Sequence, residues 1–309
     1  MGAVPVKNRR RIQAQGIVLA IIGASLWGLS GTLSSILFRN YDMPFSTLVS
    51  LRMILAGVIA LAVLRPKFPR KSVRDFLVFA LAGLFGVQIT YLATISYSNA
   101  PTATLLQYLF FPIVMIYEVA RRRVSLTAGI LVSVALALGG TFELTTSFPS
   151  HSAAIILSPF ALIFGLLSAL TAALYTIMSG PLIKQNGTLP VITWAFIIGG
   201  AFSIIFSANS SYAYFSDILA RELPMIVALV LLVAVLGTLV AFGLYIRSMQ
   251  EITATQASLA GTMEPITAAL SSAILLGIFL TGFQYVGGVM IIMAIIIVQI
   301  FSFRPKAAA

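Results

Sequence analysis

The chain has 309 residues, of which 60% are hydrophobic and only 9% are charged, whereas roughly 25% are charged in an average soluble domain. A soluble core of this size cannot bury so much apolar surface, because surface-to-volume scaling limits the buried fraction of a globular protein. The composition therefore excludes an ordinary soluble protein, and the lack of cysteine excludes disulfide bonds and thiolate metal sites. The net charge of +11 does not indicate nucleic-acid binding, because the basic residues lie mainly between apolar segments.

Apolar segments of about 20 residues, the length that a helix needs to cross the hydrocarbon core, follow one another along the chain. They cover residues 16–38, 45–64, 76–97, 102–119, 126–144, 154–179, 189–206, 224–246, 253–276 and 282–303. The basic cluster at 7–11 before the first segment is also typical of a signal peptide, but the spans that follow favour an uncleaved first helix. We therefore expect an all-α integral membrane protein with ten transmembrane helices.

Lysine and arginine residues are divided unequally between the two ends of these predicted helices. With the N-terminus inside, the cytoplasmic side holds the clusters at 65–74 and 121–123, whereas the outer side holds Arg39 and Arg221. Basic loops stay in the cytoplasm, so we expect both termini there, as short tails at 1–15 and 304–309. The expected location is the inner (cytoplasmic) membrane, with the lipid bilayer as the surrounding partner.

A weak internal repeat relates two halves of the chain, 16–144 and 154–303. The matches are Gly86, Thr102-Ala103-Thr104 and Pro112 in the first half with Gly237, Thr253-Ala254-Thr255 and Pro265 in the second. Each half contains five predicted helices, so the second copy enters the membrane from the opposite side. Such an inverted repeat places a substrate site near the midplane between the halves. The alternative is chance similarity between helices rich in alanine and threonine.

Polar side chains inside a membrane span are costly unless they face protein or water, so helical periodicity indicates which faces line a pathway. Polar stripes run along the first, third, fourth, sixth and ninth segments, and we expect them to border one central cavity for a small-molecule substrate. The candidate substrate-binding residues are Trp27, Gln88, Tyr91, Gln107, Tyr108, Tyr175, Tyr245, Gln256 and Glu264. Alternatively, the hydroxyl and amide groups only join neighbouring helices.

The aromatic members of this set suggest a second property of the cavity. Deep tyrosine and tryptophan rings can surround an ammonium group and bind it by cation–π attraction. Tyrosine and tryptophan also anchor helices at the membrane interface, and Trp194 is interpreted as such an anchor. Trp27, Tyr91, Tyr108 and Tyr175 are expected to lie deeper.

Two ionisable residues lie inside predicted spans, and two prolines interrupt them. Glu264 is a candidate site for a coupling proton or a substrate ammonium group, or else a neutral acid hydrogen-bonded to a neighbouring group. Arg52 can pair with Glu264, bind an anionic substrate group or extend toward the interface. Pro112 and Pro265 each free a backbone carbonyl one turn earlier, so helix breaks or hinges are expected near them.

The fifth and tenth segments differ from the others because they carry almost no polar residues. Gly139-Gly140 and Gly287-Gly288 give these segments small surfaces for close packing. We interpret both as peripheral helices that face lipid or form a dimer, and the sequence is compatible with a monomer or a homodimer.

Local motifs of one known family occur along essentially the whole chain. They are Ala24-Ser25-Leu26-Trp27-Gly28, Arg52 near Ala56-Gly57, Pro112 with the turn at 121–125, Ala173-Leu174-Tyr175-Thr176, and Met263-Glu264-Pro265 with Gly287-Gly288. Together they resemble the EamA family of the drug/metabolite transporter superfamily. The resemblance implies two five-helix repeats, a central cavity, and export or exchange of amino acids or other small metabolites. Leu276-Gly277-Ile278 stands where many members have a Gly-Glu pair, so no role is carried over for that carboxylate.

The expected function is therefore secondary transport by alternating access, most simply export of an amino acid or a related metabolite. No Gly-rich loop ends in Gly-Lys-Ser/Thr, so energy comes from a gradient, with proton coupling as one option, or the protein only facilitates diffusion. No cofactor and no metal are expected. The alternatives are import of a quaternary ammonium compound or, more distantly, a membrane enzyme. An enzyme is disfavoured because the lone His151 lies in an outer loop and no paired carboxylates share one face.

Overall fold

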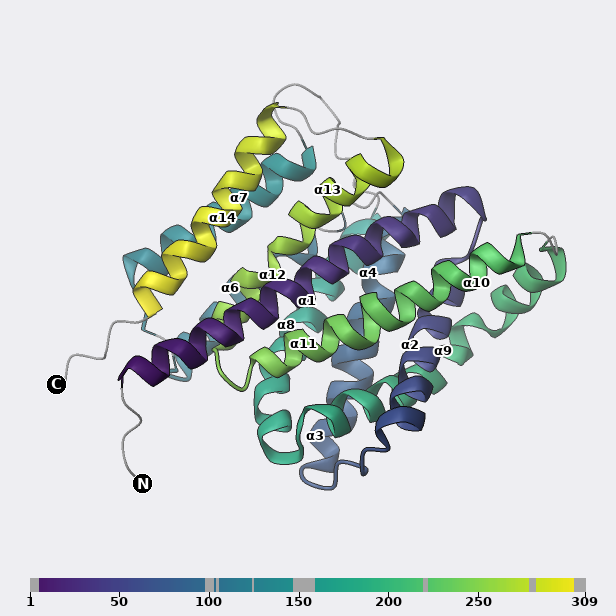
Figure 1. The fold of residues 1–309 in the computed structure, drawn as a ribbon, viewed down its shortest axis with the longest axis horizontal. Coiled ribbons are helices and arrows are strands. Elements are labelled where there is room, and N and C mark those ends of the chain that lie inside the picture. Colours follow the sequence, from purple (N-terminus) through teal and green to yellow (C-terminus); the bar gives the residue numbers. More distant parts are fainter. Residues whose placement is uncertain are drawn as a thin grey trace.

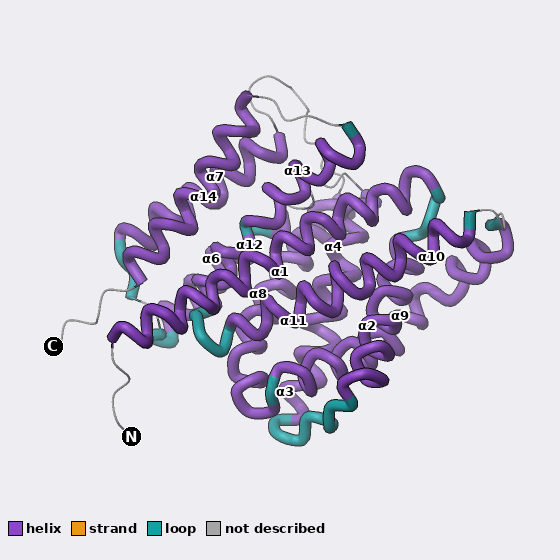
Figure 2. The backbone as a smooth tube through the Cα atoms, viewed as in Figure 1, coloured by secondary structure: helices purple, strands orange, loops and turns teal. Residues whose placement is uncertain are grey.

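The structure is a computed structural model that describes residues 6–97, 103, 106–123, 125–146, 159–218, 222–277 and 282–302. Every regular element in these ranges is helical, and the helices lie side by side as a bundle (Figure 1). Short loops join many of them (Figure 2). The all-α class predicted from composition is confirmed.

The helices of the two halves follow the same sequence of long and interrupted elements. The first half contains α1 (Val6–Asn40), α2 (Phe45–Leu64), α3 (Val73–Val78), η1 (Phe79–Phe85), α4 (Gly86–Tyr97), α6 (Phe110–Ala120) and α7 (Ala128–Thr146). The second contains α8 (Pro159–Asn186), α9 (Thr188–Asp217), α10 (Leu223–Leu232), η2 (Val233–Val240), α11 (Ala241–Ser248), α12 (Ala254–Gly261), α13 (Met263–Leu276) and α14 (Gly282–Ser302). The π-helical segments η1 and η2 each lie within one continuous helical stretch, at corresponding places in the two halves.

Within the described residues, six helical stretches are long and apolar enough to cross a membrane. They are Arg11–Asn40, Phe45–Leu64, Val73–Thr94, Pro159–Asn186, Thr188–Asp217 and Leu223–Ser248, and shorter apolar helices cover Phe110–Ala120, Ala128–Glu143 and Tyr285–Ile297. The predicted ninth span is divided into α12 and α13. Residues 102, 104 and 105 of the predicted fourth span lie outside the described residues, so the count of ten remains a prediction.

Some helix ends differ from the predicted segments. Helix α1 begins at Val6, so residues 6–15 of the expected N-terminal tail extend the first helix. Helix α9 continues to Asp217, beyond the predicted end at 206, through a serine-rich stretch. The predicted outer loop with His151, Arg221 and the tail 304–309 lie outside the described residues.

Serine and threonine hydroxyls explain why α9 continues through this polar stretch. They pair with hydroxyls of α2 at Oγ–Oγ distances of 2.8 Å for Ser46–Ser210 and 2.6 Å for Ser50–Ser207, and Thr47 Oγ1 lies 3.0 Å from Ser211 Oγ. Hydroxyl groups that satisfy each other between helices can remain inside a membrane span. Hydropathy alone underestimates the length of such a helix because it counts these residues as polar.

Helix packing is two-fold in pattern. Helix α2 packs against α9, α6 against α12 and α7 against α14, so the second, fourth and fifth helices of each half each contact their own counterpart. The first helix of each half also packs in the same way. Helix α1 contacts α11 as α8 contacts η1 and α4, and α1 contacts α13 as α8 contacts α6. The halves therefore interlock instead of forming two separate bundles.

Helices α7 and α14 form a closely packed pair at one edge of the bundle (Figure 1). A Cβ atom on Gly140 would lie 2.7 Å from the Gly287 carbonyl oxygen and 2.9 Å from Met290 Cβ, so only glycine permits this approach. The outward-facing side chains of the pair, such as Leu131, Val289 and Ile292, are exposed. The predicted close packing at Gly140 is confirmed, whereas a Cβ atom on Gly288 would meet no described residue within 4 Å.

Candidate functional site

Two interrupted helices bring the halves together inside the bundle. Helix α6 begins directly after a turn at 108–109, and one residue separates α12 from α13. Each interruption comes about one turn before a proline, Pro112 or Pro265, because proline cannot close the i→i−4 hydrogen bond and its ring crowds the carbonyl of residue i−4. That carbonyl for Pro265 belongs to Gly261, and it accepts a hydrogen bond from the Tyr108 hydroxyl at 3.5 Å. The interruption before α6 therefore lies next to the interruption between α12 and α13.

An aromatic cluster lies beside these breaks and joins α1, α8 and α11. The Trp27 ring centroid is 4.7 Å from that of Phe242 and 4.6 Å from that of Tyr245, and the Tyr175 ring stacks on Tyr245 at 6.2 Å. The Tyr245 hydroxyl lies close to the Ser258 side chain of α12. The structure thus brings three predicted site residues, Trp27, Tyr175 and Tyr245, into one wall whose rings pack mainly on one another.

The remaining two predicted aromatic residues lie near this wall. The Tyr108 ring packs on Phe111 at 4.9 Å, and Tyr91 of α4 packs against the buried core. Tyr108 lies within electrostatic range of Tyr91, Tyr245 and Glu264. These residues come from both halves of the chain, so the arrangement depends on how the halves meet.

The two charged residues predicted within the spans lie near this cluster and near each other. Arg52 of α2 is 8% exposed, and it interacts electrostatically with Tyr91 and Glu264. Glu264, in the first turn of α13, is half-buried. Among the described residues, the ion pair within 4.0 Å is Arg247–Glu251, so Arg52 and Glu264 attract each other without contact.

Several buried hydrogen-bond donors in this region have no partner among the described residues. They are the Nε1 atom of Trp27, the Nε atom of Arg52, the Nε2 atom of Gln88 and the hydroxyl of Tyr175. Buried polar groups are nearly always hydrogen-bonded in native proteins, and an unmet donor is costly. Two of these donors belong to the aromatic wall, those of Trp27 and Tyr175, and a third belongs to Arg52, one of the two separated charges.

Two predicted site residues use their amide groups within the protein. Gln256 forms a capping box at the start of α12, in which its Oε1 accepts from the Thr253 backbone N–H at 3.0 Å and its own N–H donates to Thr253 Oγ1 at 3.2 Å. Gln107 donates from Nε2 to Ser168 Oγ of α8 at 3.0 Å. For these residues, the structure favours the alternative of helix capping and helix joining.

Glu118 belongs to the polar stripe of the fourth predicted span, but its structural role was not predicted from the sequence. It is 3% exposed at the end of α6, and its carboxylate accepts hydrogen bonds from Ala254 N at 3.3 Å, Thr255 N at 2.9 Å and Thr255 Oγ1 at 2.7 Å. A carboxylate at a helix N-terminus satisfies free N–H groups and the helix dipole. Glu118 therefore links the end of α6 in one half to the start of α12 in the other.

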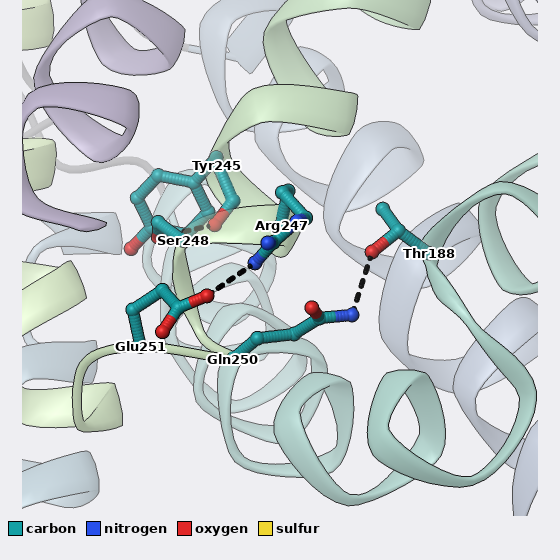
Figure 3. A network of polar contacts seen from close by, with 6 residues as sticks. All are labelled: Thr188, Tyr245, Arg247, Ser248, Gln250 and Glu251. Carbon is teal, nitrogen blue, oxygen red and sulfur yellow. Dashed lines mark hydrogen bonds and ion pairs between the residues drawn. The ribbon is translucent and has the colours of Figure 1, made fainter. Parts of the chain in front are cut away.

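A second polar network lies where α11 ends and the chain turns into α12 (Figure 3). Arg247 Nη1 donates to Glu251 Oε1 at 2.9 Å, and Gln250 Nε2 donates to Thr188 Oγ1 of α9 at 3.1 Å. The Ser248 hydroxyl donates to the Tyr245 carbonyl at 2.6 Å. The loop at the end of α11 is therefore attached to α9, a few residues after Tyr245 of the aromatic wall.

Comparisons with known proteins agree with this architecture. The model of the "EamA-like transporter family" matches residues 14–146 and 159–300 of the chain. A protein of Salmonella typhimurium strain LT2 named "Uncharacterized inner membrane transporter YicL" is 33% identical over 303 residues, which cover 96% of this chain and 98% of that protein. A crystal structure that is 14% identical has the same fold, with a TM-score of 0.77 over 95% of this chain and 99% of its own.

Proposed function

Because the chain belongs to the EamA-like transporter family, we propose that it is a secondary transporter that exports an amino acid or a related small metabolite by alternating access. The family and the related protein support the assignment of this chain as a multi-pass transporter of the inner membrane. The proposal adds the substrate class, the direction of transport and the mechanism. They rest on the arrangement of side chains inside the bundle.

The observation that carries the proposal is the pair of separated charges next to unmet donors. Arg52 of α2 and Glu264 of α13 interact electrostatically, so both halves contribute a charge to one region, and Arg52 itself carries an unmet donor. Charged and polar groups within a membrane span are costly and mark substrate or ion pathways. Glu264 is also the candidate for a coupling proton, since its carboxylate makes no ion pair in the described part of the chain.

The two-fold packing pattern supports the proposed mechanism. The five spans predicted in each half relate the halves as an inverted repeat, and rocking of one repeat against the other exposes a central site to each side in turn. Because the chain has no cysteine, Tyr91→Cys can be labelled alone. Alternating access predicts that a small water-soluble thiol reagent reaches this position from either side, in different states. Lack of reaction from both sides contradicts the cavity.

The transport proposal is tested with purified protein in liposomes. Uptake of radiolabelled amino acids, monoamines, monocarboxylates and sugars is compared with uptake by protein-free liposomes, with and without a proton gradient. Direction is tested in cells, because overproduction of an exporter increases resistance to a toxic substrate analogue whereas an importer decreases it. The proposal is wrong if no solute of the panel moves faster than in protein-free liposomes.

The alternative function, import of a quaternary ammonium compound, depends on an open aromatic cage. Trp27, Tyr175 and Tyr245 do lie together, but their rings pack on each other and on Phe242. A cation–π site needs a free ring face within about 6 Å of the cation. The packing therefore favours a wall beside the substrate, and choline uptake in the same liposomes is the discriminating measurement.

A further inference from the structure

Arg52 and Glu264 are opposite charges that interact electrostatically without an ion-pair contact. Inside a protein of low dielectric constant, opposite charges attract much more strongly than in water. Long, flexible side chains normally close such a gap. A gap that persists therefore requires that the helices carrying the two groups are held at their positions by other contacts.

Close glycine contacts hold both helices. A Cβ atom on Gly57 of α2 would lie 2.9 Å from the Ile197 backbone nitrogen of α9. A Cβ atom on Gly28 of α1 would collide with the Glu264 carbonyl oxygen and with Thr267. Arg52 is thus carried by a helix packed on α9, and Glu264 by a helix packed on α1, so each charge is attached to a different neighbour.

The hydrogen-bonding needs of the two groups are complementary. Within the described part of the chain, Arg52 Nε has no acceptor, and the Nε2 of Gln88 and the Nε1 of Trp27 also lack one, whereas the carboxylate of Glu264 needs donors. A guanidinium binds a carboxylate through parallel N–H donors in a plane. An ammonium group supplies three donors to a carboxylate such as that of Glu264.

Building on the proposed transport function, we infer that Arg52 and Glu264 are the two ends of a clamp for a zwitterion. Arg52 binds the carboxylate of the substrate, and Glu264 binds its ammonium group. An α-amino acid carries both groups and bridges the two protein charges. It satisfies the donors and the acceptor together, with no net charge added to the membrane interior.

Other classes of substrate leave one end of the clamp unpaired. A monoamine neutralises Glu264 but leaves Arg52 buried without an anion, and a monocarboxylate does the reverse. A sugar supplies hydrogen bonds but neutralises neither charge. Because an unpaired buried charge is strongly destabilising, binding is expected to require both groups on one molecule.

The first test uses the unmodified protein. The amino acid that gives the largest thermal shift among the twenty common ones is compared with its methyl ester, which lacks the carboxylate, and with its N-acetyl form, which lacks the ammonium group. The clamp predicts that each modified form binds at least 10-fold more weakly by calorimetry. Equal binding of either form overturns it.

The second test uses paired variants, because a merely structural role does not distinguish the ligand forms. Arg52→Gln is expected to weaken amino-acid binding at least 10-fold but to change methyl-ester binding less than 3-fold. Glu264→Gln is expected to weaken amino-acid binding similarly but to leave binding of the N-acetyl form nearly unchanged. Arg247→Gln and Glu251→Gln, which alter the ion pair at the end of α11, are the matched controls. An equal loss for all ligand forms overturns the clamp.

The outcome is separable from that of the transport proposal. If the protein transports a monoamine, a monocarboxylate or a sugar in liposomes but binds no amino acid, the clamp is wrong and the transport function stands. If it transports no solute of the panel, the proposed function fails first. If a variant is unstable, the modified ligands on the unmodified protein still decide the question.

Discussion

Replacing Glu118 by glutamine changes one carboxylate oxygen to an amide group and leaves the shape of the side chain almost unchanged. Its Oε2 accepts from Thr255 N and Thr255 Oγ1, and its Oε1 accepts from Ala254 N at 3.3 Å. The amide oxygen can keep the two contacts with Thr255. The amide NH₂ group then faces the Ala254 N–H, so that hydrogen bond and the negative charge at the helix N-terminus are lost.

The size of this effect follows from the lost contacts. A hydrogen bond to a charged group contributes about 1.5 kcal/mol or more, and a charge at a helix N-terminus contributes about 0.5 kcal/mol. The sum is about 2 kcal/mol, which corresponds to roughly a 30-fold change in an equilibrium constant. We therefore expect the start of α12 to open about 30-fold more often in Glu118→Gln.

Hydrogen–deuterium exchange with mass spectrometry measures this opening in purified protein. Peptides that cover residues 253–262 should exchange about 30-fold faster in Glu118→Gln. The control Glu251→Gln removes an ion pair whose side chains are 41% and 25% exposed and should change exchange much less, since exposed pairs contribute at most about 1 kcal/mol. Unchanged exchange in Glu118→Gln would show that Glu118 does not hold α12.

Three further predictions follow. Gly140→Ala places a Cβ atom 2.7 Å from the Gly287 carbonyl oxygen and should lower the free energy of unfolding by about 1–3 kcal/mol. The control Gly139→Ala places its Cβ atom near the end of the Met290 side chain and should cause no such loss. Thermal melting of both variants in detergent decides this. Tyr108→Phe removes the 3.5 Å hydrogen bond to the α12–α13 break and should cost less than about 1 kcal/mol, so a melting loss of several kcal/mol would mean that the hydroxyl has another role. Reporter fusions after Lys71 and Arg123 should both read cytoplasmic, and an external signal after either would contradict the predicted topology.

Hydropathy predicted the positions of the helices because it depends on the preference of each segment for lipid and not on the helices that pack against it. The bounds predicted for α2, 45–64, agree with the structure, since proline precedes the helix at 44 and follows it at 66. The division between α12 and α13 was indicated only indirectly, by Pro265. The end of α9 could not be predicted, because its polar residues remain helical through hydroxyl contacts with α2.

The candidate site was harder to predict because a polar residue on a helix has several uses. Gln256 lies at the fourth position of a Thr-x-x-Gln pattern, a local capping signal that competes with a substrate-binding role. Glu118 is different, because its partners are 136 and 137 residues away in the sequence. Only the packed fold shows that contact. Arg52, Glu264 and Gln88 were indicated by their cost in lipid, but the interaction of Arg52 with Glu264 required the structure.

The hydroxyl pairs between α2 and α9 have a consequence for biogenesis. Ser50 and Ser207 are 157 residues apart, and at about 5–20 residues per second the ribosome makes α9 roughly 10–30 s after α2. During that interval α2 is in the membrane without its partner. A hydroxyl within a helix can bond to a carbonyl of its own preceding turn, as Ser203 does to the Gly200 carbonyl at 2.6 Å. When α9 arrives, the hydroxyls of α2 and α9 exchange such local bonds for bonds with each other, and this pairing aligns the two helices while α10 to α14 are still to be made.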